Sequence, residues 1–246
     1  MFDSLRAKGF DVEFQSHARA ILSYEYQAAI AELEEILLAI SIPIGELVGS
    51  GGGETKTTQR LRRAFSKKGW IKTNFEIRKE INGRAQSSIS HEVDHVRTFD
   101  GTAIALEIEW NNKDPFFDRD LENFKRLHVE GAISIGVVIT RGTTFQAAIK
   151  DRVMRYAQRE GLRSIDDLRD HRLTRTERQR RELERALKLA EKTGKSFAEV
   201  WAGNLCNDKF GESTTHWKKL QDRLSRHVGH PCPLLLIGIP IEVVTD

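Results

Sequence analysis

The sequence predicts an α/β fold with a mixed central sheet flanked by helices, because strand-like and helix-like hydrophobic spacings alternate along one chain. The region from Gly69 to Thr140 contains two hairpin signals, Asn82-Gly83 and Asp100-Gly101, between alternating segments. Ala132 to Thr140 is a nearly continuous apolar run of strand length, which is typical of a central strand covered on both faces. We see no linker, so we expect a single domain over residues 1–246, with a core at about 55–160 and a helical elaboration at about 161–230.

Each predicted element follows from its local pattern. The first sixty residues are expected to be helical, with apolar residues at helix-like spacing over Ser16–Ala39. A basic helix with a narrow apolar stripe follows over about Thr55–Lys67, and the arms of the second hairpin are expected near Ser88–Phe99 and Thr102–Trp110. The remaining elements are a strand over Ile71–Lys79, a helix from Asp114-Pro115 to Gly131, the central strand, a helix over about Phe145–Arg159, a charged helix within Thr174–Lys192 and a final strand over Leu234–Val244.

Composition excludes several classes of protein. With 39% hydrophobic and 8% aromatic residues in 246, the chain can bury a sizeable core, which argues against a disordered protein. Two cysteines and no signal peptide argue against a secreted disulfide scaffold and favour a cytoplasmic location. The longest apolar run, near Ile36–Ile44, is too short to span a membrane.

The charge of the chain is unevenly distributed. The formal net charge is only +3, which by itself argues against a polybasic nucleic-acid coat. Thr55 to Lys79, however, contains nine Lys or Arg against one acid, a local charge of +8. The charged stretch Thr174–Lys192 fits a solvated helix with charge pairs three and four residues apart better than a DNA-binding arm.

Two motifs resemble known sites without meeting their requirements. His91-Glu92-Val93-Asp94-His95 matches the zinc-protease pattern, but that chemistry needs a helix, and the flanks here alternate as in a strand. In a strand, four residues span about 13 Å, so the two histidines cannot share one ion. The Gly51–Thr57 segment lacks the glycine that precedes the lysine in a phosphate-binding loop, and Glu54 would repel a triphosphate. It fits either a flexible joint or a backbone contact to a DNA phosphate.

The second hairpin concentrates acidic residues. If Asp100-Gly101 is a two-residue turn, Phe99 pairs with Thr102, and counting away from the turn places Asp94 opposite Glu107. The same register places Glu92 opposite Glu109. Glu107 and Glu109 share one face of their strand, and directly opposed side chains have Cβ atoms about 5 Å apart.

Four carboxylates in one small patch would repel one another. A solvated acidic edge would normally interleave Lys or Thr among them, whereas a divalent cation removes the conflict. Hard oxygen ligands suit Mg²⁺. An acidic magnesium site beside a basic helix favours an enzyme that acts on a polyanion, with the metal activating water and neutralising charge on a phosphodiester.

At these residues the chain resembles the PD-(D/E)xK nuclease superfamily and, more closely, the BglII-like type II restriction endonucleases. The resemblance rests on Ile89–Val96, Ile104–Trp110, the helix that contains Asp120-Leu121, and Ile133–Thr140. It covers about Thr55–Arg141 and implies a restriction-endonuclease-like core with helical N- and C-terminal elaborations.

Carried over by position, the resemblance implies that Asp94 and Glu107 hold the catalytic Mg²⁺, with the backbone carbonyl of Ile108. Glu109 occupies the place usually held by a lysine that positions or deprotonates the attacking water. It is therefore expected to act either as the general base or as a further metal ligand, and Lys113 is a weaker substitute for the lysine.

The resemblance further implies in-line hydrolysis of double-stranded DNA with 5′-phosphate products, and a homodimer that cuts both strands of a palindromic site. Lys56, Arg60 and Arg63 of the basic helix are expected to bind DNA. Asn111, Asn112 and Lys113 fit either base readout in the major groove or a polar loop before a helix. A monomeric nicking or repair nuclease, and a DNA-binding protein with a decayed nuclease core, are the alternatives.

Overall fold

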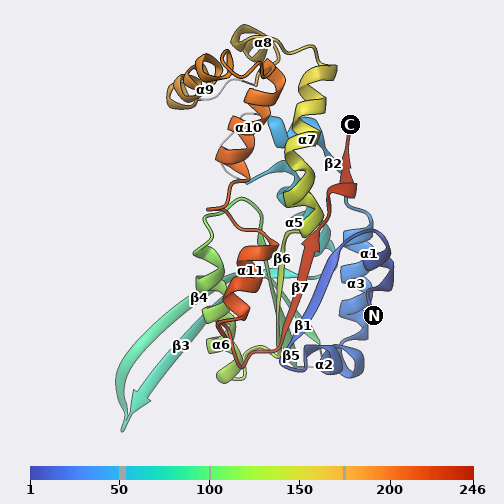
Figure 1. Cartoon of the computed structure of the whole chain (residues 1–246). Helices are drawn as coiled ribbons and strands as arrows, with labels where there is room; N and C mark the ends of the chain where they lie inside the picture. The colour runs from blue at the N-terminus through green and yellow to red at the C-terminus, as the bar shows by residue number, and fades with distance from the viewer. Residues whose placement is uncertain (50–53, 100, 174–175) are drawn as a thin grey trace.

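The computed structural model describes residues 1–49, 54–99, 101–173 and 176–246, with the side chains of residues 85–88 left out (Figure 1). Its main sheet has the order β1-β7-β6-β5-β4-β3. The strands are β1 (Asp11–Gln15), β3 (Ile71–Ile81), β4 (Arg84–Phe99), β5 (Thr102–Glu109), β6 (Ile135–Arg141) and β7 (Leu234–Ile239). A second, two-stranded sheet joins β2 (Ile42–Pro43) to β8 (Val244–Thr245).

The sheet is mixed, as the sequence predicts. Strands β5, β6 and β7 pair in parallel, whereas β3–β4, β4–β5 and β1–β7 pair in the antiparallel sense. Every residue of β6 and β7 is buried, which agrees with the apolar runs that encode them. Figure 1 shows β3 and β4 continuing beyond the other strands as a two-stranded ribbon, with α8 and α9 at the opposite end of the molecule.

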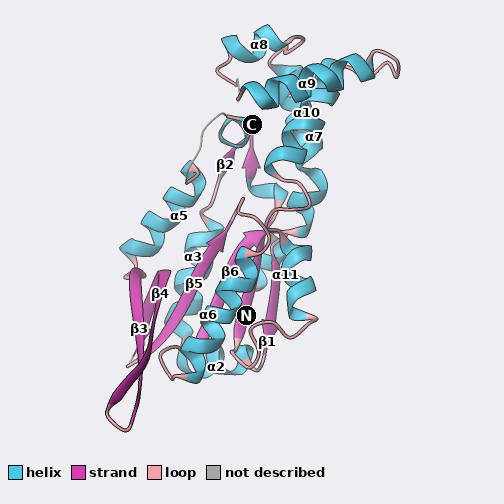
Figure 2. Ribbon diagram, turned by 90° about the vertical axis from the view of Figure 1, so that its left-hand side faces the viewer, coloured by secondary structure: helices cyan, strands magenta, loops and turns pink. Residues whose placement is uncertain are grey.

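Helices cover the sheet on both faces. Figure 2 shows the strands side by side, with helices packed along them. On one face, Ala103 and Ala105 of β5 pack with α6 (Phe116–Val129) and α11 (Trp217–Leu224). On the other face, Ile104 and Leu106 join a larger core. The helices that contribute to that core are α1 (Asp3–Ala7), α2 (Ala18–Glu25), α3 (Gln27–Leu38), α4 (Ile44–Val48), α5 (Lys56–Lys67), α7 (Thr143–Arg159), α8 (Ile165–Asp170), α9 (Glu177–Ala190) and α10 (Phe197–Lys209).

The described elements match the predicted ones closely in the middle of the chain and less closely at its ends. The hairpin at Asn82-Gly83, the helix before Gly131 and the strand that ends in Arg141 are confirmed. The all-helical expectation for the first sixty residues is wrong, because Asp11–Gln15 forms β1. This short segment pairs with β7, more than 200 residues later, so its conformation depends on a partner that local spacing does not reveal. In the described part of the chain no helix is long and apolar enough to cross a membrane.

Gly136 lies where β6 packs tightly against Phe124 of α6. A Cβ atom there would lie 2.5 Å from Cδ2 of Phe124 and 2.9 Å from Cδ2 of Leu234, both of which are buried. We therefore expect Gly136→Ala to lower the free energy of unfolding by about 1–3 kcal/mol through overpacking. This corresponds to a fall in Tm of about 2–4 °C per kcal/mol for a protein of this size.

The matched control is Gly203→Ala in α10, where a Cβ would meet its nearest neighbour, Cε of Lys150, at 3.7 Å. Alanine favours a helix interior over glycine, so the Tm of this variant should stay level or rise. Calorimetric scans of both variants test the packing, and a Gly136→Ala protein as stable as the wild type would contradict it.

Candidate active site

Two carboxylates reach the α6 side of the sheet from β5. Side chains alternate along a strand, so Glu107 and Glu109 continue the face that Ala103 and Ala105 begin. Glu107 is 7% exposed and Glu109 is 3% exposed. Charged side chains are rarely buried to this extent unless they are paired or bind a metal.

A third buried carboxylate, Asp120, comes from α6. It is 2% exposed and lies in the helix stripe that otherwise buries Phe117, Leu121, Phe124 and Leu127. Sequence reasoning placed Asp120 only within the family motif and did not count it among the site residues. An acid in an apolar helical stripe is the signal that could have found it.

The β4–β5 register brings Asp94 to this group. Phe99 pairs with Thr102, and the ladder continues to the pair His95 and Leu106, which confirms the predicted register; the turn residue Asp100 lies outside the described residues. Next to this last pair, the backbone N–H of Asp94 donates to Oε1 of Glu107 at 3.4 Å.

A β-bulge shapes β4 at Asp94. Val93 pairs with Thr73 of β3 and Val96 pairs with Ile71, so β4 carries one extra residue over this interval. Both valines are buried on the α6 face, whereas Asp94 between them is exposed. The bulge therefore leaves the Asp94 carboxylate free to face a ligand.

The expected opposition of Glu92 and Glu109 is wrong. Beyond the bulge β4 leaves β5 and stays with β3, so Glu92 pairs with Asn74. Its exposed carboxylate forms an ion pair with Lys72 at 2.6 Å. Asp120 takes its place in the acidic cluster, which we define as Asp94, Glu107, Glu109 and Asp120.

The His-Glu-x-x-His segment lies in β4, as predicted, so its histidines are not on adjacent turns of a helix. Among the described residues, no group of three or more His, Cys, Asp or Glu side chains is arranged so that it could hold a metal ion as it stands.

Burial and mutual repulsion raise the pKa values of three members of the acidic cluster. Burial is the largest cause for Glu107, whose pKa lies well above its usual range, and the charges of Asp120, Asp94 and Glu109 add to it. Burial followed by the charge of Asp120 raises the pKa of Glu109 to about 9. The pKa of Asp120 is also raised, mainly by burial.

One neutral side chain, Asn112, and one cationic side chain, Arg119, contact the acidic cluster. Nδ2 of Asn112 donates to Oε2 of Glu109 at 2.7 Å. The Arg119 guanidinium lies 2.7 Å from Oδ1 of Asp120 and 3.7 Å from Oε1 of Glu109, while its other side stacks on the Phe116 ring. Arg119 therefore offsets part of the negative charge from α6.

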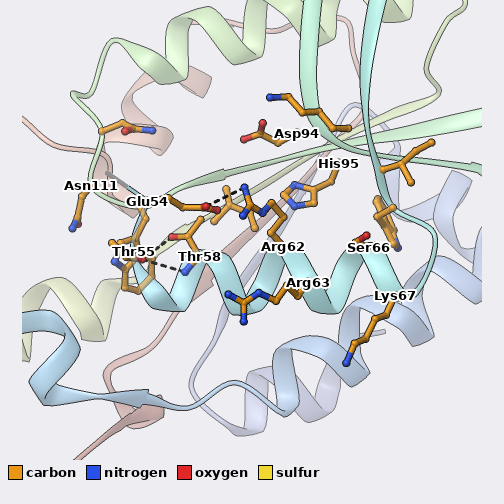
Figure 3. A pocket seen from close by; sticks show the side chains of 16 residues that line it. Glu54, Thr55, Thr58, Arg62, Arg63, Ser66, Lys67, Asp94, His95 and Asn111 are labelled. Atoms are coloured by element: carbon orange, nitrogen blue, oxygen red, sulfur yellow. Dashed lines mark hydrogen bonds and ion pairs between the residues drawn. The ribbon is translucent and has the colours of Figure 1, made fainter. Parts of the chain in front are cut away.

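A cleft of about 840 Å³ adjoins Asp94 and lies between α5, the bulged part of β4 and the end of β5. Figure 3 shows Arg62 projecting from α5 toward the side where Asp94 and His95 lie, paired with Glu54 at 3.0 Å, while Arg63 projects from another side of the helix. Lys67 and Lys72 add further positive charge. The lining residues are Glu54, Thr55, Thr58, Arg62, Arg63, Ser66, Lys67, Trp70, Ile71, Lys72, Asp94, His95, Ile108, Trp110, Asn111 and Asn112.

The cleft brings together Arg63, Asn111 and Asn112 of the residues predicted to bind DNA, but not Lys56, Arg60 or Lys113. Arg60 instead grips Glu46 with two N–O contacts of 2.7 and 3.0 Å and so ties α5 to α4. Lys113 lies in a β-bridge with Thr214.

Sequence reasoning missed three basic residues of the cleft, Arg62, Lys67 and Lys72. Leu61 and Phe65 mark the buried stripe of α5, so the helical period could have singled out the arginines on its flank. No local sequence pattern indicates that Lys72 lines the cleft, because its position depends on the direction that β3 takes after the end of α5.

The raised pKa values predict that the metal-free protein loses stability as the pH rises. Unfolded Glu titrates near 4.5 and folded Glu109 near 9, so between these values the folded state keeps a proton that the unfolded state releases. The free energy of unfolding should fall across this window, by up to about 1.4 kcal/mol per pH unit for each such carboxyl.

Glu109→Gln should remove its share of this slope, whereas Glu130→Gln, at the exposed end of α6, should keep it. Calorimetry in EDTA from pH 5 to pH 9 measures both. Equal slopes in the wild type and the Glu109 variant would show that Glu109 does not titrate as described.

Comparison with known proteins agrees with this architecture. Residues 10–239 match the family model described as restriction endonuclease BglII/BglIII. The match includes β1, the whole acidic cluster, the cleft and β7. A search of curated proteins found no match. Because the family model spans most of the sequence, the chain belongs to the BglII/BglIII family of restriction endonucleases.

Proposed function

We propose that the protein is a Mg²⁺-dependent type II restriction endonuclease that cuts double-stranded DNA at a short palindromic site and leaves 5′-phosphate ends. The observation that carries this proposal is the acidic cluster beside a basic cleft. Glu107, Glu109 and Asp120 are buried together, and Asp94 joins them to the cleft. A phosphodiester needs both features, since cations hold its backbone and a metal site cleaves it.

The residues present fit a magnesium ion. All the side-chain donors of the acidic cluster are oxygen atoms, which hard divalent cations prefer. Oδ2 of Asp120 is buried without a hydrogen-bond partner in the described part of the chain. Since the described carboxylates do not yet converge on one point, binding would draw them together by side-chain rotation.

Asp94 and Glu107 would hold the ion, together with the carbonyl oxygen of Ile108. When bound, magnesium lowers the pKa of water and neutralises charge on the phosphate. A cation bound beside Glu109 would favour its ionised form, and Glu109, oriented by Asn112, would then take the proton of the attacking water. The water oxygen bonds to phosphorus as the bond from phosphorus to the 3′ oxygen breaks, and that oxygen takes up a proton. The products are a 5′-phosphate and a 3′-hydroxyl.

The side chains of the cleft would hold the DNA. Arg62, Arg63, Lys67 and Lys72 supply positive charge for phosphate contacts that do not depend on sequence. Asn111 is the best placed of the three candidates for base readout, because Asn112 is engaged by Glu109 and Lys113 lies outside the cleft. Lys56 would act at the border of the bound DNA, whereas Arg60 is engaged by Glu46.

We propose a homodimer for a geometric reason. The described chain has a single acidic cluster of this kind, so one protomer cleaves one strand at a time. Two protomers related by a twofold axis can address both strands of a palindrome together.

Glu107→Gln tests the catalytic assignment. We expect the wild type with Mg²⁺ to convert supercoiled plasmid into discrete linear fragments. The variant should bind DNA but lose cleavage by more than the roughly 10- to 100-fold typical of residues that only support metal ligands. Glu130→Gln is the control and should cut normally.

The products of this assay separate the alternatives. Persistent nicked circles would favour the monomeric nicking nuclease over the dimer, and a wild type that binds without cutting would favour a decayed core. Undiminished cutting by Glu107→Gln would exclude the proposed site.

Metal binding is testable without any reaction. At pH 8 the acidic cluster costs stability, and a bound cation stabilises the folded state by RT ln(1 + [L]/Kd). Saturating Mg²⁺ should therefore raise the Tm of the wild type by several degrees and that of Glu107→Gln by much less. An equal rise in both proteins would place the ion elsewhere.

A further inference from the structure

Arg141 is a fully buried arginine at the end of β6. Its exposed fraction is 0%, and within the described chain it forms no ion pair. Burial lowers its pKa to about 9, which measures how unfavourable this position is for a charge. A charge kept in such a place without a carboxylate partner needs a reason beyond packing.

The guanidinium is surrounded by neutral acceptors from distant parts of the chain. Nε donates to the carbonyl of Trp110 at 2.9 Å and to that of Thr215 at 3.1 Å. Nη2 donates to Oγ1 of Thr214 and to the Thr215 carbonyl, both at 2.6 Å, and Nη1 donates to Oε1 of Gln146 at 2.8 Å. A planar fork with five N–H donors can make these bonds at once, whereas a lysine ammonium cannot.

These bonds join the loop after β5 to the segment before α11. The backbone N–H of Thr215 donates to the carbonyl of Asn112 at 2.9 Å. Lys113 forms a β-bridge with Thr214, and the N–H of Asp114 donates to the Ser213 carbonyl at 3.1 Å. Arg141 thus donates hydrogen bonds to both segments of a short backbone pairing, the loop after β5 and the segment before α11.

The same loop carries the side chain that holds Glu109. Strand β5 ends at Glu109, so beyond it the described backbone is held by the short pairing with Thr214 and Thr215 and no longer by the main sheet. Asn112 reaches back three residues to the Glu109 carboxylate at 2.7 Å. A continuous path of hydrogen bonds therefore runs from Arg141 through Thr215 and Asn112 to Glu109.

We propose that Arg141 is a positioning residue for the cleavage reaction. It holds the loop after β5 against Thr214 and Thr215, so that Asn112 keeps the Glu109 carboxylate in its working orientation. The proposal rests on the proposed function, because the orientation of Glu109 matters only if Glu109 takes part in the reaction. It also explains why a charge whose hydrogen-bond acceptors are all neutral is kept in the interior.

The test is a double-mutant cycle on kcat. The variants are Arg141→Met, Asn112→Ala and the double variant, measured at saturating DNA with Mg²⁺, with the Kd for DNA measured in EDTA. Each single variant should lose about 10- to 100-fold in kcat, as residues that orient a site carboxylate do. If Arg141 acts through Asn112, the double variant should be within about threefold of the slower single variant.

Controls separate this role from a general loss of folding. Arg155→Met removes an exposed arginine from α7 and should leave kcat unchanged. The DNA-binding stoichiometry gives the folded fraction by which each kcat is corrected. Thr214→Val removes a single acceptor of Arg141, and it replaces Arg141→Met in the cycle if that variant does not fold.

Hydrogen exchange of the metal-free protein gives a readout that needs no activity. Peptides covering residues 109–114 and 212–216 should exchange faster in Arg141→Met, while those from β7 should not. Unchanged exchange, an unchanged kcat or multiplying losses in the double variant would each overturn the proposal. A wild type that cuts no DNA would instead overturn the proposed function, and the exchange result would still decide whether Arg141 holds the loop.

Discussion

The burial of three carboxyl groups at the end of β5 is the constraint on which the site depends. Glu107, Glu109 and Asp120 enter the same interior region from a strand and a helix, and burial, with the charges of neighbouring carboxylates added to it, raises all three pKa values. Hydrophobic side chains would fill this region at lower cost. The sheet, α6 and the Arg119 contact hold the acids together, which is understandable if a cation completes the group.

The sequence allowed much of this site to be predicted, because a tight turn sets register by counting. The pairing that follows from Phe99 and Thr102 brings Asp94 to Glu107. Counting fails at Glu92, since one extra residue in β4 redirects the strand to β3. Asp120 could not be located by counting at all. It comes from a different element, and its position depends on how α6 packs on the sheet.

Neither the net charge of the chain nor the local charge of α5 tells how much positive charge lines the cleft. Arg60 and Arg62 are two residues apart on α5 and therefore face different directions. Arg60 forms an ion pair with Glu46 of α4 and holds two helices together, whereas Arg62 lines the cleft and forms an ion pair with Glu54 at 3.0 Å there. The sequence identifies a basic helix, but only the packing of its apolar stripe decides which of its arginines are available to DNA.

The position of β7 between β1 and β6 has a consequence for biosynthesis. β7 is encoded near the end of this sequence, yet it pairs with the first strand and with the central one. While a ribosome is still translating the preceding segments, β1 has no partner and β6 has an open edge. The segment at Thr214–Thr215 that braces the loop after β5 is also made late. A nascent or prematurely terminated chain without β7 therefore has an unfinished sheet, in which β1 and β6 both lack the strand that joins them.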